Sequence, residues 1–298
     1  MRPPSSGPAT ASSRPRVRAA ATDAPAVPPR RNGAGRGRSP LAELLVSLLP
    51  FSAVLGAYAV AQWVNSGLNA DPVAGRPNGL GFPLRVTEPI AADRWLFGRV
   101  PTPWLQERLY PDGAAHWWDA LVAPVYSSHF VVIPVVGAVL WFRHRDRFRP
   151  WVWSVFLLVA TGVVLYIVYP MAPPWMAARD GYLEPVQRLS GLGWRVLGLD
   201  FLDTVQSRGQ QQGNTVAAMP SLHAGAATLV AAFFWAGRGP LARLLLLAYP
   251  LAMAFALVLT GEHYVVDALV GILLAVLAVL TVTWSGRRVA RRSGTTRT

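Results

Sequence analysis

The sequence predicts an all-α membrane protein, a polytopic bundle of six transmembrane helices with both termini in the cytoplasm. Apolar residues make up 52% of the 298 residues and charged residues only 14%, with a mean hydropathy of +0.32. Soluble domains usually carry about 25% charged residues. Six apolar segments, together with an alternation of charge between the segments that connect them, complete the case for this fold.

Each apolar segment has roughly the 20 residues that a helix needs to cross the hydrocarbon core. The expected spans are 41–64, 118–142, 151–170, 219–237, 241–260 and 263–284. Tryptophans lie near several of the expected ends, as is typical of membrane interfaces. The span 219–237 is dominated by Ala and Gly, which predicts close contact with other helices inside the bundle.

The charges of the connecting segments assign their sides of the membrane. The segment 1–39 holds eight Arg and one Asp, loop 143–150 has three more basic than acidic residues, and the tail 285–298 holds five Arg. Loops 65–117 and 171–218 each hold equal numbers of Arg and acidic residues. Because basic segments stay in the cytoplasm, the two neutral loops are expected on the extracytoplasmic face of the cell membrane.

The domain organisation follows from the same pattern. We expect a disordered Arg/Pro-rich cytoplasmic tail over 1–39, a six-helix membrane domain over 40–284, and a basic cytoplasmic tail over 285–298. Basic tails beside apolar spans indicate contact with the bilayer rather than nucleic acid. Cys and Lys are both absent from the sequence, which excludes disulfides, thiolate metal sites and lysine Schiff bases.

Two histidines stand at the expected starts of spans. His223 follows Pro220-Ser221, where the first N–H groups of a helix can bind an anion. His263 and Asp267 are four residues apart, so they share a helix face and the carboxylate can fix the imidazole tautomer. The 40 residues between the histidines are about two spans, which returns both to the same membrane face.

These residues carry a family resemblance. Pro220-Ser221-Leu222-His223 and His263-Tyr264-Val265-Val266-Asp267 resemble two signatures of the type-2 phosphatidic acid phosphatase superfamily. Pro173-Pro174-Trp175 is similar to a signature of its inositolphosphotransferase (inositol phosphorylceramide synthase-like) branch. The likeness covers about residues 90–300.

The resemblance implies a lipid phosphatase or phosphotransferase that acts on a phospholipid or lipid-linked phosphate through a phosphohistidine intermediate. His263 would attack phosphorus, Asp267 would orient it, and His223 would protonate the leaving oxygen. The substrate-binding residues would be Ser221, Tyr264, Trp175 and one arginine. No metal or other cofactor is expected.

The sequence departs from the superfamily pattern in its cations. The first signature normally supplies a Lys and an Arg to the phosphate, and neither stands before Pro170; the third normally has an Arg where this chain has Leu257. Arg179 is our first expected substitute, with Arg188 and Arg208 as weaker ones. The missing cations favour a phosphodiester or lipid-linked substrate.

Several alternatives stay open at this stage. Hydrolysis and transfer differ only in the acceptor, and the oligomeric state is not indicated. A transporter or a non-catalytic scaffold would also be polytopic, although the chain shows neither an internal repeat nor charges near the centres of the spans. His129, inside the span 118–142, is a functional candidate because it is a polar group within the membrane, but a helix–helix hydrogen bond is the favoured interpretation.

Overall fold

The computed structural model describes residues 40–295, and within that range it contains helices and no β-strand. The long helices are α1 (Pro40–Val64), α5 (Asp119–Arg143), α6 (Arg145–Val168), α10 (Leu222–Phe234), α11 (Pro240–Leu259) and α12 (Val265–Thr295). The short helices are α2 (Ser66–Ala70), α3 (Thr87–Phe97), α4 (Pro101–Leu109), α7 (Pro174–Arg179), α8 (Leu192–Val196) and α9 (Asp200–Gln211). The predicted tail 1–39 lies outside the described residues. Of the predicted tail 285–298, the part through Thr295 continues α12 and the remainder also lies outside.

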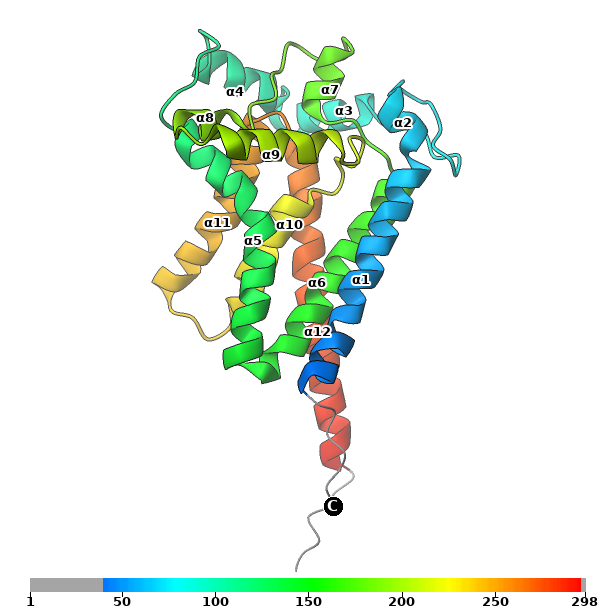
Figure 1. Cartoon of the computed structure of the whole chain (residues 1–298), viewed down its shortest axis with the longest axis vertical. Helices are drawn as coiled ribbons and strands as arrows, with labels where there is room; N and C mark the ends of the chain where they lie inside the picture. The colour runs from blue at the N-terminus through cyan, green and yellow to red at the C-terminus, as the bar shows by residue number, and fades with distance from the viewer. Residues whose placement is uncertain (1–39, 296–298) are drawn as a thin grey trace, which may run out of the picture. The chain divides into compact units, whose positions relative to one another are not determined.

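The long helices run side by side, and the short ones gather at one end of them (Figure 1). Helices α1, α6 and α11 rise toward that end, and α5, α10 and α12 descend from it. Helices α8 and α9 lie across the ends of the long helices rather than along them. The two neutral loops of the sequence therefore form one layer of short helices, and the basic connections lie at the opposite end.

Four helices are long and apolar enough to cross a membrane: α5, α6, α11 and the part Val265–Gly286 of α12. The described apolar part of α1 is Ser52–Val64, and α10 has only 13 residues. At 1.5 Å per residue α10 is about 20 Å long, less than the ~30 Å hydrocarbon core. It is shorter than the predicted span 219–237 because Ser221 caps it at one end and Gly237, with φ 74°, follows it at the other.

Helix α10 is the buried centre of the bundle, and α12 is its most extensive neighbour. The two backbones approach closely at Gly225 and Gly271. A Cβ added to Gly225 would lie 3.2 Å from the Gly271 carbonyl oxygen, and one added to Gly271 would collide with the Ser221 carbonyl oxygen. Small residues on α10 thus allow the close helix contact that their pattern predicts.

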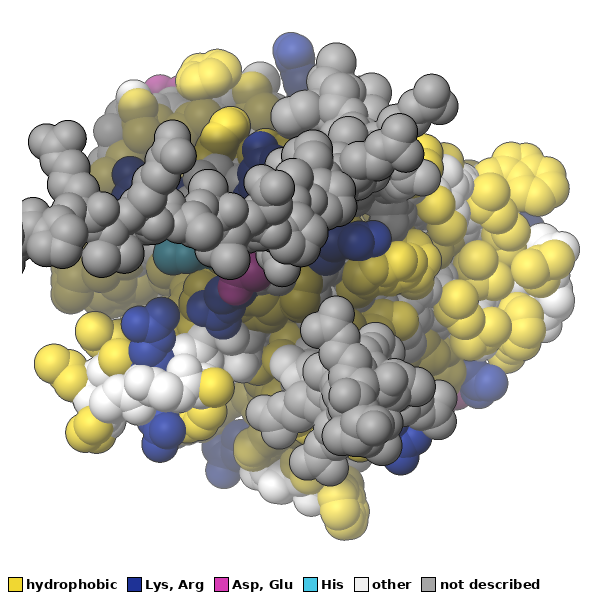
Figure 2. All heavy atoms as spheres, turned by 90° about the horizontal axis from the view of Figure 1, so that it is seen from below, with side chains coloured by type: hydrophobic (Ala, Val, Ile, Leu, Met, Phe, Trp, Pro, Cys, Tyr) yellow, Lys and Arg dark blue, Asp and Glu magenta, His cyan; other side chains and the backbone are white. Residues whose placement is uncertain are grey.

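The connection 143–150 is shorter than the sequence suggests, because α6 begins at Arg145 rather than near 151. Aromatic contacts hold this extra turn in place. The Arg145 guanidinium lies 4.3 Å from the Trp141 ring centroid, and that of Arg147 lies 5.0 Å from Phe233 and donates to the Phe233 carbonyl at 3.1 Å. Figure 2, seen from this end, shows arginine side chains on the end face and hydrophobic side chains around it.

Candidate active site

The start of α12 brings His263 and Asp267 into contact. The His263 Nδ1 lies 3.3 Å from Asp267 Oδ2, and the same oxygen accepts a hydrogen bond of 2.9 Å from the Tyr264 N–H. Both side chains are buried. With Nδ1–H directed to the carboxylate, the lone pair of His263 Nε2 is left for chemistry.

A second carboxylate, from outside this motif, fixes the start of the same helix. Asp93 on α3 accepts hydrogen bonds from the N–H groups of Val265 (3.1 Å) and Val266 (3.0 Å). It therefore serves as an N-cap supplied by another helix, although the side chain is fully buried. Burial raises the pKa of Asp93 above its ordinary value in spite of the two N–H donors.

His223, in the first turn of α10, lies beside His263. Their ring centroids are 5.8 Å apart, and His223 Nε2 is buried without a hydrogen-bond partner. The two helix starts are tied together because the Ser221 N–H donates to the Asp267 carbonyl oxygen at 3.1 Å. The three residues expected to be catalytic are thus brought together.

The two histidines line a cavity of about 880 Å³. Its walls come from α1, α5, α6, α7, α8, α9 and α10, the segments on either side of α9 and the turn before α12, and most of the lining is apolar. Helix α9 contributes Leu202, Val205, Gln206 and Gln210. Part of the loop 171–218 thus forms a helical wall of the cavity.

His129 on α5 also lines this cavity, and the sequence did not assign it there. Its ring centroid lies 3.6 Å from that of His223, and Tyr126, one helical turn earlier, stacks on His223 at 4.8 Å. His129 Nδ1 also lies 3.2 Å from the Tyr126 carbonyl oxygen, within its own helix. A histidine inside an apolar span was the available signal, but nothing local linked it to His223.

Two of the expected substrate-binding residues have structural contacts instead of places on the cavity wall. Ser221 is fully buried, and its Oγ accepts from the Ala224 N–H at 3.3 Å as the N-cap of α10. Tyr264 is buried in the cluster around Met171 and Met176, and its hydroxyl has no hydrogen-bond partner. Neither lines the cavity.

Comparison with known proteins places the chain in a family. The family model described as the PAP2 superfamily matches residues 88–281, which include both histidines and Asp267. The chain belongs to the PAP2 superfamily. Phosphoinositol dihydroceramide synthase of Bacteroides thetaiotaomicron is 28% identical over 250 residues, covering 80% of this chain and 76% of that protein. No solved structure matches the chain significantly.

Membership in the PAP2 superfamily, the resemblance to a synthase and the apolar helices identify the chain as a membrane lipid phosphatase or phosphotransferase. No group of three or more His, Asp or Glu side chains positioned to hold a metal ion occurs among residues 40–295.

The proline–tryptophan motif lies at the cavity, but its arginine does not. Pro173 and Trp175 line the cavity, and the Trp175 N–H donates to the Gly261 carbonyl at 3.2 Å. The Arg179 side chain is half exposed, does not line the cavity, and forms two hydrogen bonds with Asp180, at 2.6 and 3.0 Å. Arg188, a weaker candidate from sequence, does line it.

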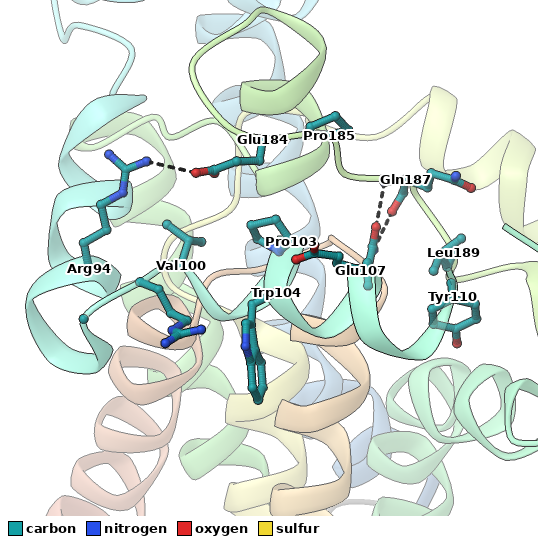
Figure 3. A pocket seen from close by; sticks show the side chains of 13 residues that line it. Arg94, Val100, Pro103, Trp104, Glu107, Tyr110, Glu184, Pro185, Gln187 and Leu189 are labelled. Carbon is teal, nitrogen blue, oxygen red and sulfur yellow. Dashed lines mark hydrogen bonds and ion pairs between the residues drawn. The ribbon is translucent and has the colours of Figure 1, made fainter. Parts of the chain in front are cut away.

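A second cavity, of about 680 Å³, lies between α3, α4 and the segment 184–189 (Figure 3). Arg94 and Glu184 form an ion pair of 3.6 Å at its edge, and Trp104 faces it from α4. It contains none of the histidines. The first cavity is therefore the candidate active site.

Proposed function

We propose that this PAP2 member transfers a phosphate-bearing headgroup between lipids through a phosphohistidine formed on His263. The observation that carries the proposal is the pair of imidazoles in one cavity, 5.8 Å apart, one of them bonded to a buried aspartate. An imidazole oriented by a carboxylate, with a second imidazole beside it, can supply the nucleophile and the general acid for displacement at phosphorus.

In the first step the lone pair of His263 Nε2 attacks phosphorus, and the bond from phosphorus to the leaving lipid oxygen breaks. Protonated His223 gives its proton to that oxygen, so the lipid leaves as a neutral alcohol. The phosphorylated imidazole carries a positive charge, which the Asp267 carboxylate at Nδ1 stabilises.

In the second step a hydroxyl oxygen attacks phosphorus, the P–N bond breaks, and neutral His223 accepts the hydroxyl proton. An alcohol as acceptor gives transfer, and water gives hydrolysis. The relative is named as a synthase of phosphoinositol dihydroceramide. This supports a phosphodiester with an inositol headgroup as substrate and a lipid alcohol as acceptor.

We further propose that α1 and α10 complete a set of six spans, with both termini in the cytoplasm and the active site toward the extracytoplasmic face. The start of α1 and the end of α12 lie at the same end of the bundle, which supports this topology (Figure 1). The basic connection between α5 and α6 lies at that end too. Because the chain has no Cys, single cysteines can report the two sides.

The two single-cysteine variants are Asp112→Cys, in the segment between α4 and α5, and Asp146→Cys, at the start of α6. Both positions are exposed. In intact cells a membrane-impermeant maleimide should label the first and not the second. The reverse labelling would overturn the topology while leaving the chemistry untouched.

The chemistry is tested by headgroup transfer from phosphatidylinositol to ceramide with purified protein, alongside phosphate release. His263→Ala should abolish turnover, and His223→Ala should lower it by about 10²–10⁴-fold, the range for loss of a general acid. His144→Ala, at an exposed site between α5 and α6, is the matched control and should retain full activity. Turnover that survives in folded His263→Ala would refute the nucleophile.

A further inference from the structure

The cavity of the proposed enzyme needs a fixed cation for the phosphate. Phosphoryl transfer develops negative charge on the non-bridging oxygens, and donors that are already in place stabilise it. Of the arginines among residues 40–295, Arg188 is the one whose side chain lines the cavity that holds the histidines. With no Lys in the sequence, this guanidinium is the fixed positive charge of the cavity wall.

Arg188 is held by the residue next to the proposed nucleophile. Its Nε and Nη2 donate to the two Glu262 carboxylate oxygens at 2.8 and 2.9 Å. Burial by itself lowers the pKa of Arg188, but the hydrogen bonds and charge of Glu262 outweigh it and leave the pKa above its ordinary value. Two of the five guanidinium N–H groups are used in this way, which leaves three for a ligand.

Glu262 is occupied by donors from the protein. Besides Arg188, its Oε1 accepts from the Ser190 hydroxyl at 2.5 Å and from the Gln210 amide at 3.1 Å. A buried carboxylate with this many donors orients its partners instead of binding a ligand itself. It therefore fixes the Arg188 fork beside His263.

The backbone that carries Arg188 is also fixed, from the side of the second cavity. The buried Gln106 amide donates to the Gln187 carbonyl at 2.9 Å and accepts from the Gln187 N–H at 2.8 Å. The dashed lines beside Gln187 in Figure 3 mark these bonds. Two residues after Gln187, the Leu189 N–H donates to the Thr260 carbonyl at 3.1 Å. The fork is thus pre-organised in backbone and side chain.

Trp175 completes the arrangement. The Arg188 guanidinium carbon lies 4.8 Å from the Trp175 ring centroid, and that of Arg179 lies 5.7 Å from the same ring. The two arginines therefore share one aromatic neighbour, but only Arg188 lines the cavity. A substitution of Arg179 therefore serves as the control that removes one arginine charge near Trp175 without changing the cavity wall.

We propose that Arg188 is the phosphate-binding cation of this site and that Glu262 is its positioning residue. The lipid substrate in this inference rests on the proposed function. The kind of ligand that Arg188 would bind, a phosphate oxyanion, does not. An Arg fork presented by a neighbouring carboxylate takes the place of the cations that the signatures of this chain lack.

The test uses purified full-length protein and two readouts: transfer kinetics with phosphatidylinositol, and the rise in thermal stability with orthovanadate, a soluble phosphate analogue. Arg188→Gln should lose about 10²–10³-fold in kcat/KM, the range for loss of one oxyanion donor, and should lose the vanadate response. Arg188→Lys should recover only part of both, because a point charge does not replace the fork. Arg179→Gln should stay within a few-fold of wild type in both readouts.

Glu262→Gln keeps an acceptor for Arg188, so its vanadate response and its KM should lie between those of wild type and those of Glu262→Ala. If Glu262→Gln and Glu262→Ala give the same vanadate response and the same KM, the positioning role of Glu262 is overturned. If Arg188→Gln does not fold because Glu262 is left unpaired, Arg188→Gln/Glu262→Gln removes both charges and is measured in its place. A vanadate response in that variant equal to wild type overturns the proposal for Arg188. Wild type that responds to vanadate through Arg188 but transfers no lipid headgroup overturns the proposed function alone.

Discussion

Asp93 provides a sharp test of how the proposed nucleophile is positioned, because it caps the start of α12 from outside the histidine–aspartate motif. Its two carboxylate oxygens accept from the N–H groups of Val265 and Val266, at the helix start that follows His263. Asp93→Ala removes both acceptors, whereas Asp93→Asn keeps one oxygen in a side chain of the same shape. The pair of variants therefore separates loss of the cap from loss of the charge.

The magnitude follows from the two bonds. A buried donor left without a partner costs about 1–3 kcal/mol, and a carboxylate at a helix N-terminus contributes up to about 2 kcal/mol. With partial relief by water, Asp93→Ala should cost about 2–5 kcal/mol of unfolding free energy. Asp93→Asn should cost about 1 kcal/mol, the usual effect of a changed cap.

Thermal unfolding in detergent and transfer kinetics measure both consequences. At about 2–4 °C per kcal/mol for domains near this size, Tm should fall by roughly 10 °C for the Ala variant and by roughly 3 °C for the Asn variant. Because His263 moves with the frayed helix start, kcat should fall by about 10²-fold for Ala at temperatures where it is folded. Equal Tm and kcat in the two variants would refute the capping argument.

Three further outcomes are expected. Gly271→Val places a side chain against the Ser221 carbonyl, so α10 and α12 must separate and kcat should fall by about 10²-fold. Gly286→Val, with open space around the added carbon, is the control and should leave kcat unchanged. An equal loss of kcat in both variants would contradict the packing argument. Burial raises the pKa of Asp93, so ionisation removes part of the stability that this cap contributes, while its two oxygens remain acceptors. The contribution is largest below the unfolded-state pKa of about 3.9 and decreases, without vanishing, as pH rises through the folded pKa. Unfolding curves between pH 3 and 7 should show this decrease in wild type but not in Asp93→Asn, and identical pH dependence in the two proteins would argue against it. Chelators should leave transfer unchanged, whereas inactivation that added metal reverses would point to a different chemistry.

The fold was predictable where its determinants are local. Four of the six apolar segments are helices of spanning length and composition, and small residues predicted the close contact at Gly225. The length of α10 was not predictable from hydropathy, because apolar residues continue beyond the helix at both ends, before the cap Ser221 and after Phe234. The short helices in loops 65–117 and 171–218 depend on packing across the end of the bundle more than on their own periodicity.

The geometry of the candidate site was also predictable only in part. The four-residue spacing predicted that His263 and Asp267 lie together. The two spans between His223 and His263 predicted that the chain returns to the same end of the bundle, where the two rings lie 5.8 Å apart. By contrast, Asp93 lies 172 residues before the first N–H group that it caps, and Arg188 lies 74 residues before Glu262. No local pattern connects residues so far apart in the chain, so only the tertiary structure brings them to the site.

The most direct measurement is the site of covalent labelling during turnover. Purified enzyme is mixed with phosphatidylinositol carrying a labelled headgroup and no acceptor, quenched at alkaline pH where phosphohistidine survives, and mapped by mass spectrometry. The label should reside on the peptide that contains His263 and should be absent from folded His263→Ala. Label on His223 or His129 instead, or turnover without any labelled histidine, would contradict the account.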